Sequence, residues 1–270
     1  MAITTDRGAL TFTFPELGRD ARLHVTFQRT LRTPDPVGRY GPVGDDGALR
    51  LAQGSPDGDA HATIPMWQSE ATWLDFSSPH MHPFLVMVGV DGVNAISGDV
   101  FTGMPDFDAD DYLEVPTQPS LASHRGPAGD GFDDRQFIAP STHTVADGGR
   151  TGTLVQLTVI PMRADAWARR RRHLPSAPGT CVLCDISRAE QSRARPRLTA
   201  PRVTGPLESA DTWHPTTFDT AAVRIVNSVA WKSLTGEPVP RAALTSADYA
   251  AHDLPWYPVY DETVEHSAPL

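Results

Sequence analysis

Two closely spaced histidines are the first candidates for chemistry in this chain. His80 and His82 are two positions apart and directly precede an apolar run that begins at Phe84. On an extended segment this spacing points both imidazole rings to the same side, as two ligands of one metal ion require. By their distance along the chain, His124 and His143 are candidate third ligands. A polar turn that enters a strand explains the same residues, so both interpretations stay open.

Glu70 is the candidate catalytic residue. It lies in the segment from Ile64 to Phe76, whose density of large apolar side chains predicts burial. A buried carboxyl group has a perturbed pKa and can act as a general acid or base. A buried carboxylate can equally be tied to an arginine or to a backbone amide. Catalysis and a structural role are therefore the two alternatives for Glu70.

A set of amide and guanidinium side chains stands beside aromatic residues at several points of the chain. Such side chains can line one pocket or contact face, or they can hydrogen-bond the ends of strands and loops. The members are Gln28, Arg29, Gln68–Glu70, Gln118, Arg135 and Gln136. We treat them as candidate binding residues.

Charge is spread unevenly along the chain. The 23 basic and 33 acidic side chains give a formal net charge of −10, which disfavours binding of nucleic acid by the molecule as a whole. The segment from Arg163 to Arg202 nevertheless holds ten arginines and three acidic residues. It can dock an acidic protein partner or fold back on an acidic body. The candidate binding residues in it are Arg169, Arg170, Arg171 and Arg172.

The two cysteines form a single CxxC at Cys181 and Cys184. Plain structural thiols, a metal site and a redox pair all agree with this spacing. The chain lacks GxSxG, HExxH, a Walker A loop and GxGxxG, so common hydrolase, zinc-protease, nucleotidase and dinucleotide functions are not first choices. The sequence specifies no cofactor.

Hydrophobic patterning predicts a β-rich α+β fold: an antiparallel sandwich or barrel-like body, a basic helix and arm, and a small C-terminal α/β cap. Segments 9–14 and 22–28 alternate and are expected to pair as a hairpin. Residues 84–90 form a continuous apolar run, typical of a strand buried on both faces, which Asp91-Gly92 should turn into 93–96. Residues 135–139 and 153–160 are expected to pair. Helices are predicted at 164–173, 227–234 and 245–252.

We divide the chain into a β-rich body at 1–174, a Pro/Arg-rich linker or arm at 175–217 and a C-terminal cap at 218–270 that packs on the body. We expect the three to form one integrated domain. Gly and Pro together number 46 of 270 residues, which indicates many loops. Neither a membrane-spanning run nor a secretory signal is visible, so the expected location is cytoplasmic. The 22 arginines against one lysine are typical of a GC-rich, actinobacterial genome.

Six scattered stretches resemble an uncharacterised family of bacterial proteins of similar length. They are 27–35, 66–76, 111–119, 135–139, 226–237 and 254–261. The resemblance covers a whole architecture, but no activity is established for that family, so it assigns no functional residue. Between about Cys181 and Thr217 this chain departs from the glycine-rich, glutamine-containing segment of the other members.

Two functional hypotheses follow. The first is a non-catalytic binding or assembly protein that engages a protein partner, or a second copy of itself, through the Arg-rich arm or the aromatic-polar face. The second is an enzyme with a noncanonical site at Glu70 or at His80 and His82, acting on a small molecule in specialised metabolism.

Overall fold

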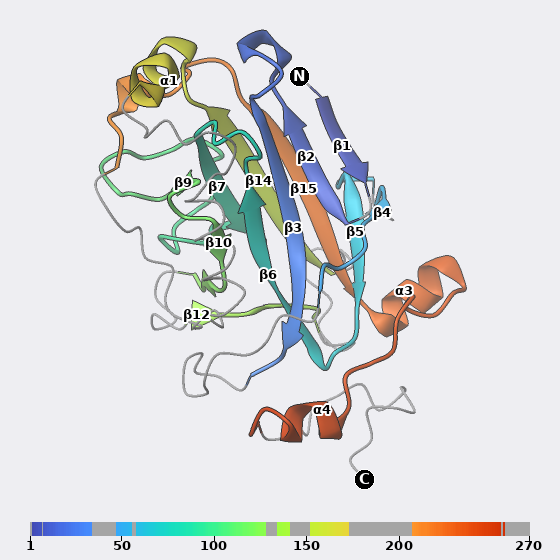
Figure 1. The fold of residues 1–270 in the computed structure, drawn as a ribbon. Helices are drawn as coiled ribbons and strands as arrows, with labels where there is room; N and C mark the ends of the chain where they lie inside the picture. The colour runs from blue at the N-terminus through green and yellow to red at the C-terminus, as the bar shows by residue number, and fades with distance from the viewer. Residues whose placement is uncertain are drawn as a thin grey trace.

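The computed structural model describes residues 2–6, 8–33, 47–55, 58–127, 134–140, 152–172, 207–254 and 256. In this part of the chain two β-sheets face each other and short helices lie at the two ends (Figure 1). The β-rich α+β sandwich predicted from the sequence is confirmed. Cys181, Cys184, His143 and most of the predicted 175–217 arm lie outside the described residues.

The first sheet has six strands, and every pairing in it is antiparallel. Its strands in spatial order are β1 (Ala2–Asp6), β2 (Ala9–Thr13), β3 (Arg22–Leu31), β6 (Glu70–Ser77) and β10 (Ser120–Leu121), with β13 (Phe137–Ile138) also on β6. The short 3₁₀ helix η1 (Pro15–Leu17) connects β2 to β3. The predicted hairpin is confirmed, with Leu10 opposite Val25.

The second sheet has seven strands and one parallel pair, β5 with β15. In spatial order it contains β4 (Ala52–Gln53), β5 (Ala62–Met66), β15 (Asp219–Asn227), β14 (Thr153–Pro161), β7 (Phe84–Val90) and β8 (Val93–Asn94), with β9 (Leu113–Val115) also on β7. A separate ribbon pairs β11 (His124–Arg125) with β12 (Asp134–Arg135). Because β15 lies between β5 and β14, the C-terminal part of the chain contributes an inner strand to the second sheet.

The core lies between the two sheets. Alternate side chains of β2, β3 and β6 face those of β5, β7, β14 and β15, and each large apolar group removed from water contributes about 1.5–3 kcal/mol. All seven residues of β7 are buried, as predicted. Val86 and Val88 point into the core, while Leu85 and Met87 pack in a second cluster that includes Trp167.

One predicted pairing is wrong. Segment 135–139 does not pair with 153–160, because β13 adds to β6 in the first sheet while β14 pairs with β7 and β15 in the second. Buried side chains on both faces of β14 suit a central strand between two long neighbours. The two-residue β13 suits an edge.

Three α-helices are described. They are α1 (Ala164–Arg171), α3 (Ser228–Thr235) and α4 (Ser246–Ala250); the 3₁₀ turn η2 (Ala210–Thr212) precedes β15. We call the end of the sandwich that bears α1 and η1 the α1 end, and the opposite end the α4 end (Figure 1). No helix in the described part is long and apolar enough to cross a membrane.

Candidate functional site

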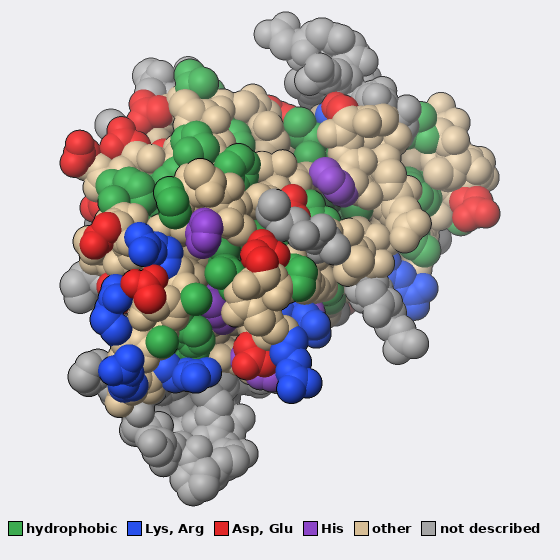
Figure 2. Space-filling model, turned by 90° about the horizontal axis from the view of Figure 1, so that it is seen from above, with side chains coloured by type: hydrophobic (Ala, Val, Ile, Leu, Met, Phe, Trp, Pro, Cys, Tyr) green, Lys and Arg blue, Asp and Glu red, His purple; other side chains and the backbone are tan. Residues whose placement is uncertain are grey.

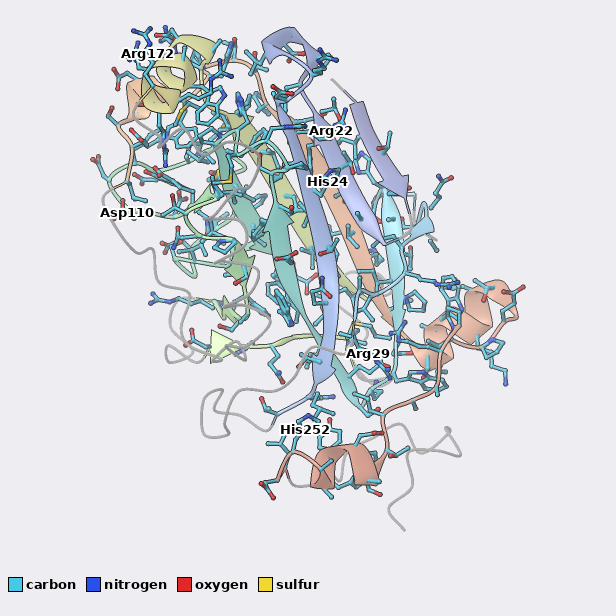
Figure 3. The ribbon with its side chains drawn as sticks, in the orientation of Figure 1. Arg22, His24, Arg29, Asp110, Arg172 and His252 are labelled. Carbon is cyan, nitrogen blue, oxygen red and sulfur yellow. The ribbon has the colours of Figure 1, made fainter. Side chains whose placement is uncertain are left out.

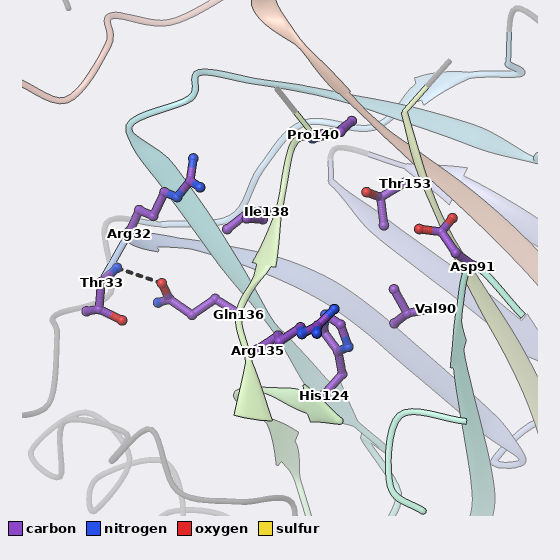
Figure 4. A pocket seen from close by; sticks show the side chains of 10 residues that line it. All are labelled: Arg32, Thr33, Val90, Asp91, His124, Arg135, Gln136, Ile138, Pro140 and Thr153. Atoms are coloured by element: carbon purple, nitrogen blue, oxygen red, sulfur yellow. Dashed lines mark hydrogen bonds between the residues drawn. The ribbon is translucent and has the colours of Figure 1, made fainter. Parts of the chain in front are cut away.

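A cavity of about 230 Å³ opens near the α4 end, where β3 and β7 finish and β14 begins (Figure 4). Both sheets and the β11–β12 ribbon contribute to its wall. The lining residues are Arg32, Thr33, Val90, Asp91, His124, Arg135, Gln136, Ile138, Pro140 and Thr153. Most ligand sites in proteins are concave spaces that combine an apolar wall with a few convergent polar groups.

The β7–β8 turn fixes one side of the cavity. Asp91 and Gly92 have φ angles of 50° and 82°, the left-handed pair that a tight hairpin turn needs. The backbone N–H of Asp91 donates to the Leu154 carbonyl (2.9 Å), and the N–H of Leu154 donates to Asp91 Oδ1 (2.7 Å). These two bonds hold the carboxyl group against the start of β14.

The ribbon supplies another side, where His124 and Arg135 face each other directly in the β11–β12 pairing. A Cβ atom at Gly126 would lie only 2.9 Å from Arg135 Cζ, so glycine is what lets the guanidinium lie on the backbone there. Burial lowers the pKa of His124 to about 4, and the positive charge of Arg135 adds a smaller lowering. His124 is therefore a neutral hydrogen-bonding group at neutral pH.

Gln136 fixes the end of β3 beside the cavity. Its Oε1 accepts from the Thr33 backbone N–H (2.6 Å), and its Nε2 donates to the Leu31 carbonyl (3.1 Å). The Thr33 hydroxyl is buried and has no hydrogen-bond partner within the described part of the chain. An unsatisfied buried hydroxyl costs free energy.

Two guanidinium groups, one carboxylate and an apolar wall line the cavity. Arg32 and Arg135 bring two guanidinium groups, which bind carboxylates through paired, charge-assisted hydrogen bonds. Arg32 also donates from Nη1 to the Gln68 carbonyl (3.2 Å), which directs its side chain. Val90, Ile138 and Pro140 supply the apolar surface.

Glu70 lies at the same end of the molecule but outside the cavity lining. Its side chain is fully buried, Arg29 Nε donates to Oε1 (2.8 Å), and the Trp67 backbone N–H donates to Oε2 (3.2 Å). Arg241 forms a second ion pair with Oε2. The geometry is that of a carboxylate tied to arginines, the structural alternative for this residue.

Two other amide candidates, Gln68 and Gln28, form hydrogen bonds in separate parts of the molecule. Gln68 Nε2 donates to the Pro140 carbonyl (2.9 Å), so this side chain supports the cavity wall from behind. Gln28 Nε2 donates to Thr26 Oγ1 (3.0 Å) on the outer face of the first sheet. Of the amide side chains expected to share one pocket, Gln136 alone is part of the cavity lining described here.

His80 and His82 lie in a turn, and the extended geometry considered for them is wrong. The Met81 N–H donates to the Ser78 carbonyl (2.9 Å), and Met81 has a φ of 60°. The His80 side chain is 55% exposed, whereas His82 is 1% exposed with its ring against Phe84 and Trp167. Among the described residues, no three His, Cys, Asp or Glu side chains come together as a metal site.

The arginines of α1 lie at the other end of the molecule. Arg169 pairs with Asp165 (2.8 Å), and Arg170 pairs with Glu208 (3.0 Å). Arg171 and Arg172 are exposed, and no carboxylate in the described residues pairs with them. Figure 2 looks onto this end and shows basic side chains gathered on one side of it; Figure 3 labels Arg172 there.

Sequence reasoning found Arg135 and Gln136 but did not assign Arg32 or Asp91 to a site, and it considered His124 only for metal. The predicted Asp91-Gly92 turn was a local sequence signal for the part of the chain that carries Asp91. Searches against protein families, curated proteins and solved structures find no match to the chain. What the fold and the cavity define is thus a class, a β-sandwich with a small arginine-bearing cavity, and the resemblance to a bacterial family stays a prediction.

Proposed function

We propose that this chain is a binding protein for a small organic anion, which the cavity at the α4 end holds. The observation that carries the proposal is that Arg32 and Arg135 both line a space of about 230 Å³ with an apolar wall. An apolar cavity of roughly 150 Å³ accepts benzene. The space therefore suits a carboxylate with a hydrocarbon body somewhat larger than one ring.

Binding fits the side chains of the cavity better than catalysis does. A general acid or base works best when its pKa lies near the working pH. Burial holds the pKa of His124 at about 4, well below neutrality. The guanidinium groups stay protonated and can orient an anion without exchanging a proton with it.

Replacing Arg135 with glutamine should weaken the binding of 3-phenylpropanoate, a carboxylate of suitable size, by roughly 10- to 100-fold. This corresponds to about 1.5–3 kcal/mol for a hydrogen bond to a charged group. Isothermal titration calorimetry on the full chain measures the effect. The matched control is R172Q, which removes an exposed guanidinium at the opposite end of the molecule and should leave the dissociation constant unchanged.

Two results would overturn the proposal. One is a wild-type protein that binds neither 3-phenylpropanoate nor hexanoate at millimolar concentration. The other is a R135Q protein that binds them as tightly as R172Q does.

A second function, docking of an acidic protein segment on α1, is favoured by the exposure of Arg171 and Arg172 without described carboxylate partners. Because the whole chain carries a net charge of −10, a short acidic segment is a better match for this local patch than a long polyanion. Neighbouring Arg169 and Arg170 are already neutralised by Asp165 and Glu208.

The double variant R171E/R172E should weaken binding of a fluorescent ten-residue polyglutamate peptide at least fivefold at low salt, because attraction becomes repulsion. Fluorescence anisotropy across a salt series measures it, since exposed charge pairs weaken as salt rises. The control R50E/K232E changes the net charge equally with exposed residues outside α1. Equal weakening in both variants would show that total charge alone, and no α1 surface, controls the binding.

A further inference from the structure

We infer that the ligand of the cavity is a zwitterion, an apolar amino acid, with its carboxylate on the arginine side and its ammonium group on Asp91. This inference rests on the proposed function and narrows its ligand class. Figure 4 shows Arg135 and His124 close together on one side of the cavity and Asp91 with Thr153 on another. The cavity therefore presents positive and negative charge from different walls.

The Asp91 carboxylate is fixed in place for such a contact. Its Oδ1 accepts from the Leu154 N–H at 2.7 Å, which sets the direction of the group and leaves Oδ2 for a ligand. Loss of surrounding water raises the pKa of the Asp91 carboxyl, so a cation beside it would stabilise the charged form. Asp91 lines the cavity from the β7–β8 turn, where its φ is 50°.

Arg224 is the positively charged side chain that acts on Asp91 through its charge, and it also binds other groups. Arg224 is 1% exposed, forms an ion pair with Asp59 and donates from Nη1 to the Gly152 carbonyl (3.2 Å). Its charge is thus largely neutralised by Asp59. Burial raises the pKa of the Asp91 carboxyl, the charge of Arg224 lowers it in part, and a ligand ammonium group hydrogen-bonded to Oδ2 would add to this stabilisation of the charged form.

A simple anion matches only half of this charge pattern. Its carboxylate would gain from Arg135 but would also feel the repulsion of Asp91 across a small space. A zwitterion matches both walls, and its side chain can pack on Val90, Ile138 and Pro140. The apolar character of these three residues, together with the volume, selects a hydrophobic side chain.

Three related compounds separate the contributions of the two charges. Phenylalanine carries both groups, 3-phenylpropanoate lacks the ammonium group, and 2-phenylethylamine lacks the carboxylate. For the wild-type chain, calorimetry should give phenylalanine a dissociation constant roughly tenfold below that of 3-phenylpropanoate, as expected for one charge-assisted hydrogen bond. Phenylethylamine should bind more weakly than phenylalanine.

The variant D91N tests the assigned contact. Asparagine tolerates the left-handed conformation and keeps an oxygen that can accept from the Leu154 N–H, so the turn should persist. The dissociation constant of 3-phenylpropanoate divided by that of phenylalanine should fall from about ten to near one in D91N and stay near ten in R172Q. Thermal unfolding of each variant reports on the fold separately.

The outcomes distinguish the two proposals. If 3-phenylpropanoate and phenylalanine both fail to bind, the proposed function is wrong. If both bind with equal affinity, an anion site exists and the zwitterion inference is wrong. If the preference for phenylalanine survives in D91N, the assignment of the ammonium group to Asp91 is wrong.

Discussion

Replacing Glu70 with glutamine is expected to lower the free energy of unfolding by about 3–5 kcal/mol, the usual cost of removing one partner from a buried ion pair. Glu70 is fully buried, and both of its carboxylate oxygens accept from guanidinium groups, those of Arg29 and Arg241. Glutamine has the same shape but no charge. Two largely buried arginines would then face a neutral amide whose N–H₂ group cannot accept from them.

The effect should spread because the same arginines hold the chain that leads to α4. Arg241 donates to the Pro65 carbonyl (2.7 Å), and Trp67 Nε1 donates to the Arg241 carbonyl (2.9 Å). Arg29 Nη2 donates to the Ala242 carbonyl (2.8 Å). Glu70 therefore joins β3, β5 and the 241–242 segment at one point.

Ligand binding in the cavity should weaken when this network is disrupted. The Tyr249 hydroxyl of α4 donates to the Ser69 carbonyl (2.9 Å) and accepts from the Arg32 backbone N–H (3.1 Å). Arg32 lines the cavity. If E70Q loosens the attachment of α4, anion affinity should fall in the same variant although Glu70 does not reach the ligand.

Urea unfolding followed by circular dichroism measures the stability change. The control is D165N, because Asp165 also binds two arginines, Arg163 and Arg169, but is 53% exposed. Solvent screens exposed ion pairs strongly, so D165N should be nearly neutral. A loss in E70Q no larger than that in D165N would contradict a stabilising role for the buried carboxylate.

Local features of the fold could be predicted because their causes lie within a few residues. Alternation in 9–14 and 22–28 gave the β2–β3 hairpin, and Asp91-Gly92 gave the turn after β7. Thr245 accepts from the Asp248 N–H and Asp248 accepts from the Thr245 N–H, a capping box that begins α4 within the helix predicted at 245–252. Each of these depends on side-chain period or on backbone conformational preference, both visible in a short window.

Partners distant in sequence could not be predicted. Arg29 and Arg241 are 41 and 171 residues away from Glu70, and nothing in the local pattern selects these two among 22 arginines. The parallel pairing of β5 with β15 likewise joins segments from opposite halves of the chain.

The cavity was missed for the same physical reason. It exists only where the end of β3, the β7–β8 turn and the β11–β12 ribbon meet, and each of these segments alone looks like an ordinary polar loop. Residues such as Arg32 and Asp91 acquire a common role only through the packing of two sheets.

Acidification from pH 6.5 to pH 4 is expected to remove about 3 kcal/mol of stability through His82 alone. Burial against Phe84 and Trp167 lowers the pKa of His82 from 6.5 to about 4. Its Nε2 is buried and has no hydrogen-bond partner in the described residues. Between these two pH values the unfolded chain binds the proton and the folded chain does not, so stability falls as pH falls.

Other groups titrate in the same range, so a difference between two proteins is the useful measurement. His124 acts in the same direction as His82, because burial also lowers its pKa to about 4. Asp111 and Glu114 act in the opposite direction, because burial raises their pKa values and the folded chain then binds protons more readily. These contributions are shared by the wild type and H82F and cancel in the comparison.

Chemical unfolding at pH 7, 6, 5 and 4 should therefore show H82F gaining about 3 kcal/mol relative to the wild type, whatever the effect of the substitution at pH 7. Phenylalanine suits the site because Phe84 and Trp167 already surround the ring. The control H80F replaces a side chain that is 55% exposed on the same turn, so the pair of variants compares the loss of a buried imidazole with the loss of an exposed one. A stability difference between H82F and the wild type that does not change with pH would contradict the prediction. It would mean that His82 is protonated in the folded protein, which its position beneath α1 allows only if that end of the sandwich opens to water.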